Sequence, residues 1–62
     1  MKSDTMTIRV YNNGYMDVEL DSRTIYTKKE NLAGWKKLAE MNNFELVHFK
    51  RFKNGDCTYW YN

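Results

Sequence analysis

The feature that most constrains the fold is a pair of alternating apolar and polar segments, residues 5–11 and 15–20, on either side of Asn12-Asn13-Gly14. Alternation with a period of two is typical of a half-buried β-strand, and a short glycine-containing connection between two such strands predicts a β-hairpin. The same pattern fixes the register, because a slip of one residue moves every side chain to the other face of the sheet.

A three-residue loop in this hairpin places Val10 opposite Met16, and the remaining apolar side chains then also pair with one another. A two-residue loop would instead place Val10 opposite Asp17. We therefore predict the three-residue loop, formed by a type I turn with Gly14 in a left-handed bulge. In this register Arg9 lies across from Asp17 on the outer face of the hairpin.

A helix is predicted after the first hairpin, because Thr27 and Glu30 have the spacing of a capping box. Asn42-Asn43 is the residue type that ends helices in a left-handed conformation. Gly34 within the helix costs about 1 kcal/mol relative to alanine, and we expect close packing against the sheet to be the reason for it. The apolar residues that share one side of this helix, and that we expect to face the sheet, are Leu32, Trp35, Leu38 and Ala39.

A second hairpin is predicted around Asn54-Gly55, with strands at residues 44–53 and 56–61. Its register stays open. With a two-residue turn, one face carries Val47, Phe49 and Trp60, and the other carries Phe44, Leu46, His48, Lys50, Phe52, Cys57, Tyr59 and Tyr61. With a three-residue loop, Val47, Phe49, Cys57, Tyr59 and Tyr61 lie opposite Leu46, His48, Lys50, Phe52 and Trp60. In either register both faces carry aromatic rings, and one helix can cover only one face.

These elements predict an α+β fold, in which an antiparallel sheet of two β-hairpins has one amphipathic helix packed on one face. Residues 23–26 add a short extra strand or an extended crossover, giving the order ββ(β)αββ within a single small domain, residues 1–62. A chain of this length buries only about 60% of the surface that its unfolded form exposes. The single cysteine, Cys57, excludes an internal disulfide, so we expect aromatic burial to stabilise the core.

Composition limits the location and the partners of the chain. No apolar run approaches the roughly 20 residues of a membrane span, and Met1–Asp4 has no signal-peptide character. A free cysteine then favours the cytoplasm, and we expect no membrane association. Residues with AT-rich codons far outnumber Gly, Ala, Arg and Pro. A reading frame this short in an AT-rich genome suggests a bacteriophage, a plasmid or a low-GC bacterium as its source.

No catalytic arrangement is predicted. Neither Ser3 nor Ser22 lies in a nucleophile motif, and the three glycines are too scattered to form a phosphate-binding loop. One histidine and one cysteine cannot supply the four ligands of a structural zinc site, so we expect no metal and no cofactor. His48 and Cys57 lie several residue pairs apart or on opposite faces of the second hairpin, and Cys57 is expected to be a buried structural residue.

The second hairpin also carries basic residues among its rings, namely His48, Lys50, Arg51 and Lys53. Aromatic rings that stack on bases and cations that neutralise phosphates suit single-stranded nucleic acid. The net charge of only +2 gives little support to this hypothesis. The alternative interpretation is that the rings form the core and the cations form a solvated face or protect an edge strand.

From Trp35 to Tyr61 the chain has a helix, then the pattern Phe-x-Leu-Val-x-x-Lys, then a hairpin. This order resembles small toxin ribonucleases of toxin–antitoxin pairs. The resemblance implies a metal-independent ribonuclease, in which His48 would be the general base and Lys50 or Arg51 would hold the phosphate. The Gly-Ser-His element of that family is absent from this sequence.

The function predicted first is that of a non-catalytic protein-binding module, a phage- or mobile-element-encoded inhibitor or modulator of a host protein or enzyme complex. Surplus aromatic surface is typical of interaction sites, and Tyr, Trp and Arg dominate binding hot spots. The expected partner-binding residues are Arg51, Phe52, Tyr59, Trp60 and Tyr61. The alternatives are a small RNA- or single-stranded-DNA-binding protein, the ribonuclease, and a homodimer that buries the surplus face.

Overall fold

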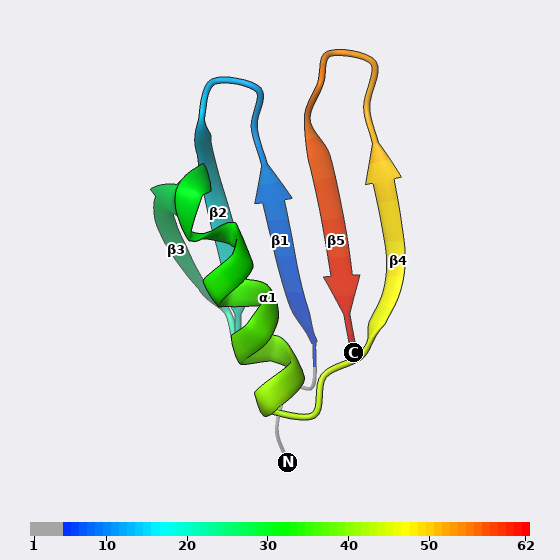
Figure 1. The fold of residues 1–62 in the computed structure, drawn as a ribbon. Coiled ribbons are helices and arrows are strands. Elements are labelled where there is room, and N and C mark those ends of the chain that lie inside the picture. Colours follow the sequence, from blue (N-terminus) through cyan, green and yellow to red (C-terminus); the bar gives the residue numbers. More distant parts are fainter. Residues whose placement is uncertain (1–4) are drawn as a thin grey trace.

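The computed structural model describes residues 5–62; Met1–Asp4, where we expected no signal peptide, lie outside the described residues. Five strands, a 3₁₀ turn and one α-helix follow one another (Figure 1): β1 (Met6–Val10), β2 (Tyr15–Leu20), β3 (Arg23–Lys28), η1 (Lys29–Asn31), α1 (Leu32–Met41), β4 (Leu46–Arg51) and β5 (Cys57–Tyr61). The strands form one antiparallel sheet in the order β3-β2-β1-β5-β4. The predicted α+β class is confirmed. Within this range no helix is both long enough and apolar enough to span a membrane.

The first hairpin has the predicted register. Val10 pairs with Met16, and Arg9 pairs with Asp17. The Tyr11 N–H donates to the Tyr15 carbonyl at 2.8 Å, which leaves a loop of three residues, 12–14. Gly14 has a φ of 92°, the left-handed conformation that the bulge requires.

The extra strand is longer than the sequence pattern indicated. β3 pairs with β2 over six consecutive residues, from Arg23 opposite Leu20 to Lys28 opposite Tyr15. The connection between them is Asp21-Ser22, whose φ values are 51° and 67°. Two successive positive φ angles are typical of the type I′ turn that joins strands through two residues. The turn was missed because Asp-Ser is a weaker signal for it than Asn-Gly.

The predicted capping box is wrong. Thr27 belongs to β3, and its hydroxyl oxygen accepts a hydrogen bond from Nδ2 of Asn31 at 2.6 Å. The chain first makes the 3₁₀ turn η1, so α1 starts at Leu32 without a side-chain cap. The predicted end is confirmed, because Asn43 has a φ of 66° directly after the helix.

The core lies between α1 and one face of the sheet. Its buried apolar residues are Met6, Ile8, Val10, Met16, Val18, Ala39 and Tyr61. Leu32 and Trp35 pack against this cluster as predicted. Leu38 does not, since it is 40% exposed; it lies about 120° around the helix from Leu32. The expected packing of Gly34 against the sheet is also wrong, because a β-carbon at this position would meet no other described part of the chain within 4 Å.

The second hairpin has the three-residue loop of the two predicted registers. Phe49 pairs with Tyr59 and Arg51 pairs with Cys57, and the Phe52 N–H donates to the Asp56 carbonyl at 2.8 Å. A bulge between Leu46 and His48 departs from the predicted pattern, because Leu46 then pairs with Tyr61. The bulge therefore moves Leu46 to the face that carries α1.

Candidate interaction surface

The helix covers only part of its side of the sheet. In Figure 1, α1 passes in front of β2 and β1, while β5 and β4 lie to one side of it. The helix reaches toward this hairpin with Lys36, whose Nζ lies 4.8 Å from the centre of the Tyr59 ring. Beyond Tyr59, every residue of β4 is exposed. This uncovered part of the sheet is the candidate site.

The side of β4 and β5 that faces the helix carries an apolar and basic surface. The Phe49 and Tyr59 rings pack at a centroid distance of 4.9 Å and an interplanar angle of 46°. Leu46 and Arg51 extend this surface along β4, because they pair with core-facing positions of β5. Phe49 is 41% exposed although it packs on Tyr59, which is half-buried. We refer to Leu46, Phe49, Arg51 and Tyr59 as the hairpin patch.

The other side of the same hairpin also carries rings. His48 and Trp60 lie opposite each other with centroids 4.9 Å apart, and Nζ of Lys50 lies 5.2 Å from the centre of the Phe52 ring. The prediction that both faces of the second hairpin bear aromatic side chains is therefore confirmed. The helix reaches the first set through Lys36 over Tyr59, and the second set lies on the face of the sheet away from the helix.

The five residues expected to bind a partner do not form one surface. Arg51 and Tyr59 belong to the hairpin patch, Trp60 lies on the opposite face, and Phe52 is beyond the end of β4. Tyr61 is only 5% exposed and is part of the core. Sequence reasoning could not separate these residues, because it left the register open. Leu46 and Phe49 were not among the expected binding residues. The register places Phe49 beside Tyr59, and the bulge places Leu46 on the same face.

The basic residues proposed for nucleic acid are likewise divided. His48 and Lys50 share the open face of the sheet, Arg51 is on the helix side, and Lys53 is in the loop. His48 and Cys57 are on opposite faces, so they form no thiol–imidazole pair. Cys57 is half-buried, as the free cysteine of a packed hairpin. In the range 5–62, no three His, Cys, Asp or Glu side chains cluster to hold a metal ion.

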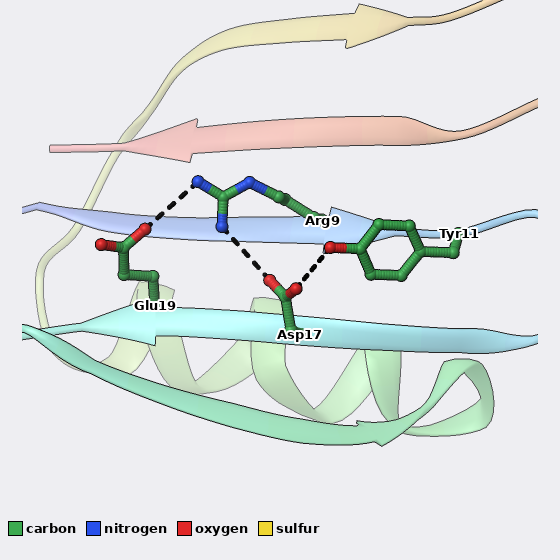
Figure 2. A network of polar contacts seen from close by, with 4 residues as sticks. All are labelled: Arg9, Tyr11, Asp17 and Glu19. Carbon is green, nitrogen blue, oxygen red and sulfur yellow. Dashed lines mark hydrogen bonds and ion pairs between the residues drawn. The ribbon is translucent and has the colours of Figure 1, made fainter.

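A network of polar contacts occupies the centre of the open face (Figure 2). Arg9 on β1 donates to Asp17 Oδ1 at 3.3 Å and to Glu19 Oε1 at 3.2 Å. The Tyr11 hydroxyl donates to Asp17 Oδ2, and this hydrogen bond, followed by burial, raises the pKa of Tyr11. The predicted position of Arg9 across from Asp17 on this face is confirmed. The carboxylates also make this part of the open face unfavourable for a phosphate backbone.

The tips of the two hairpins are joined. The Asn12 N–H donates to Asp56 Oδ1 at 2.8 Å, and Nδ2 of Asn12 donates to the Asn54 carbonyl. A β-carbon on Gly55 would lie 3.3 Å from Cβ of Asn12, so the tips are in close contact. These bonds, together with the β1–β5 ladder, hold the second hairpin in place beside the first.

Comparisons with known proteins identify no relative: no family model, no curated protein and no solved structure matches this chain.

Proposed function

We propose that this chain is a non-catalytic protein-binding module and that the hairpin patch is its contact surface. The observation that carries the proposal is the exposed Phe49 ring, which packs on the half-buried Tyr59 ring and is flanked by the exposed residues Leu46 and Arg51, beside the part of the sheet that the helix covers. Contiguous apolar surface bordered by polar residues is typical of interaction sites. Tyr and Arg are also among the residues that contribute most to binding energy at protein interfaces.

The charge around the patch favours an acidic partner surface. Arg51 belongs to the patch, and Lys36 of α1 lies over Tyr59 at its border. Complementary charge increases the association rate and selects against partners of like charge. Such a module acts by covering a surface of its partner, which is how an inhibitor or modulator of a larger protein works.

A pair of variants tests this function. Phe49→Ala removes the centre of the patch, and Tyr15→Ala removes an exposed ring elsewhere on the sheet. We expect a protein from the native host's lysate to be recovered on immobilised wild-type chain and on Tyr15→Ala, and to be lost on Phe49→Ala. Equal recovery on all three, with circular dichroism showing each variant folded, would contradict the proposal.

Nucleic-acid binding is the second candidate, and the His48–Trp60 pair beside Lys50 on the open face is the observation in its favour. Rings on a sheet surface stack on bases at about 1–3 kcal/mol each. This function requires binding of single-stranded RNA or DNA that weakens steeply as salt is raised, because each neutralised phosphate releases counterions. Binding in fluorescence anisotropy that does not change with salt would exclude nucleic-acid binding through phosphate contacts. RNA cleavage that is unchanged in the His48→Ala variant would exclude the ribonuclease.

A further inference from the structure

The strand β3 is an edge of the sheet whose centre lacks the features that usually protect edges, since its cations are confined to its two ends, Arg23 and Lys28. It pairs with β2 over its whole length without a bulge. Its central residues, 24–27, are Thr-Ile-Tyr-Thr, which are uncharged and favour strands. The opposite edge, β4, has a bulge and the adjacent cations Lys50 and Arg51, two of the devices that prevent strand addition. The β3 edge is therefore the one that another strand can extend.

An apolar groove lies on the side of α1 that faces β3. Lys36 is on the β5 side of the helix, over Tyr59. Gly34 and Leu38 are each two residues from Lys36, which at about 100° per residue places them on the opposite side of the helix. They line a groove of about 240 Å³ together with Asn31 and Trp35. We call this the helix groove.

The α-carbon of Gly34 is not packed against any described residue of the same copy outside the helix. A glycine inside a helix costs about 1 kcal/mol relative to alanine, and no described part of the protein outside the helix comes within 4 Å of where its β-carbon would be. What the missing side chain creates is room for a group from outside. Leu38 is one helical turn away on the same side and is 40% exposed, so it supplies a side chain that could fill such a space.

The helix groove and the β3 edge lie at the same level of the molecule. Figure 1 shows that α1 begins where β3 ends and runs back along the sheet. From Lys29 to Gly34 the helical chain runs back along the sheet by about 8 Å, at about 1.5 Å per residue. This distance is the length of about two residues of a β-strand. Gly34 is therefore near the level of Ile25 and Tyr26, the centre of β3.

We propose that two copies of this chain form a dimer through antiparallel pairing of their β3 strands, with the twofold axis at Ile25. The Leu38 side chain of each copy then enters the helix groove at Gly34 of the other. A twofold interface requires a surface that is complementary to itself. The groove at Gly34 and the Leu38 side chain are one turn apart on the same helix. Each copy therefore offers both a groove and a side chain to fill the groove of the other, which meets this requirement.

The backbone hydrogen bonds of β3 agree with this register. The two-residue turn makes Leu20 and Arg23 a hydrogen-bonded pair. The antiparallel alternation then directs the backbone N–H and C=O groups of Thr24 and Tyr26 away from β2. With the axis at Ile25, Thr24 of one copy lies opposite Tyr26 of the other, so these outward groups meet.

The charges of β3 agree as well. In the same register Arg23 lies opposite Thr27 of the other copy, and Lys28 lies opposite Ser22, next to Asp21. No two cations are opposed. Moving the axis to Tyr26 would place Arg23 opposite Lys29, and like charges directly opposite each other are unfavourable.

Sedimentation velocity from about 1 µM to about 1 mM tests the dimer. We expect a concentration-dependent dimer for the wild-type chain. Filling the groove with Gly34→Leu should weaken association about tenfold or more, because overpacking excludes Leu38 of the other copy. Gly34→Ala should have opposite effects on the monomer and the dimer. It should raise the thermal stability of the monomer, because alanine favours the helix, and it should weaken the dimer, because its β-carbon occupies part of the groove. A chain that stays monomeric throughout, or a Gly34→Leu variant that dimerises like wild type, would overturn the proposal.

A disulfide tests the register. In a Cys57→Ser background, Ile25→Cys places two cysteines at a pair of positions whose Cα atoms are about 4.5–5.5 Å apart, within the range of a disulfide. We expect a covalent dimer after mild oxidation of this variant and none from Thr27→Cys, which is on the same face but two residues from the axis. Equal crosslinking of both would overturn the register. Phe49→Ala, at the opposite edge, should dimerise normally even if it loses a partner protein, so the dimer and the proposed function fail separately.

Discussion

At the scale of single residues, Asp17 shows how this sheet accommodates a charge on its uncovered face. Its side chain lies on the open face, yet the residue is only 4% exposed. Arg9 and Tyr11 donate hydrogen bonds to its two oxygens. A shielded carboxylate needs such partners, because an unpaired buried charge is strongly unfavourable. The network is therefore part of the stability of the sheet.

The hydrogen bond from Tyr11 to Asp17 predicts a pH dependence of stability. Because this bond, and then burial, raises the pKa of Tyr11 in the folded chain, the folded state holds the phenolic proton more tightly than the unfolded state. Its stabilising contribution is complete below the ordinary tyrosine pKa of about 10 and is lost as pH rises through the higher folded value. Tyr11→Phe should therefore lose less stability than wild type between about pH 9 and about pH 11.

Urea unfolding at a series of pH values measures this effect. Tyr61 contributes with the same sign, because burial, followed by the nearby charge of Glu40, raises its pKa, so wild type and Tyr11→Phe should both weaken at alkaline pH, but to different extents. Tyr15→Phe, at an exposed ring, is the matched control. Identical pH profiles for wild type and Tyr11→Phe would show that the hydrogen bond does not form.

At the scale of the elements, the strained turn between β2 and β3 gives a second prediction. Ser22 has a φ of 67°, a conformation that is unfavourable for residues other than glycine by about 1–2 kcal/mol. Ser22→Gly should therefore raise the free energy of unfolding, by about 1 kcal/mol or less once the added flexibility of the unfolded chain is included. Chemical denaturation in dilute solution would measure it.

The contrasting substitution is Gly14→Ala, at a φ of 92°, which should destabilise the chain for the same reason. If Ser22→Gly destabilised the chain instead, the serine side chain would be making a contact that offsets the strain.

How far the sequence predicts each element depends on whether its side chains allow one arrangement or several. The first hairpin was predictable to the residue, because only one register keeps Val10 and its apolar neighbours away from carboxylates. The second was not, because both of its faces carry rings. The sequence pattern also gave no sign of the bulge at residues 46–48. This bulge places Leu46 on the same face of the sheet as Phe49. The capping-box prediction at Thr27 failed for a related reason. The spacing of Thr27 and Glu30 fits a helix cap, but Thr27 instead pairs with Met16 as the fifth residue of β3.

At the scale of the whole molecule, the sheet consists of a part near the helix, β3-β2-β1, and a hairpin, β4-β5. The hairpin is held by its ladder to β1, by Tyr61 in the core and by Asn12 at the tips. A matched pair of glycines probes the tip contact. Gly14 and Gly55 are both left-handed, but only Gly55 lies against Asn12. Gly55→Ala should therefore be more destabilising than Gly14→Ala. In an Asn12→Gly background, which lacks the β-carbon that residue 55 would meet, this difference should shrink. Thermal unfolding of both glycine variants in both backgrounds, with the wild type and Asn12→Gly as references, would measure the coupling.

The two edges of the sheet should also differ in hydrogen exchange. If β3 pairs with β3 of a second copy, the outward amides of Thr24 and Tyr26 gain acceptors, and their exchange should slow as the protein concentration is raised. The outward amides of β4, at Phe49 and Arg51, gain nothing from the dimer and should exchange at the same rate at every concentration. The dimer would then present one hairpin patch at each end of a continuous sheet, and two patches on one rigid body increase the avidity for a partner that repeats its binding surface. Slower exchange at β4 instead of β3 would show that the hairpin patch itself is the surface between copies.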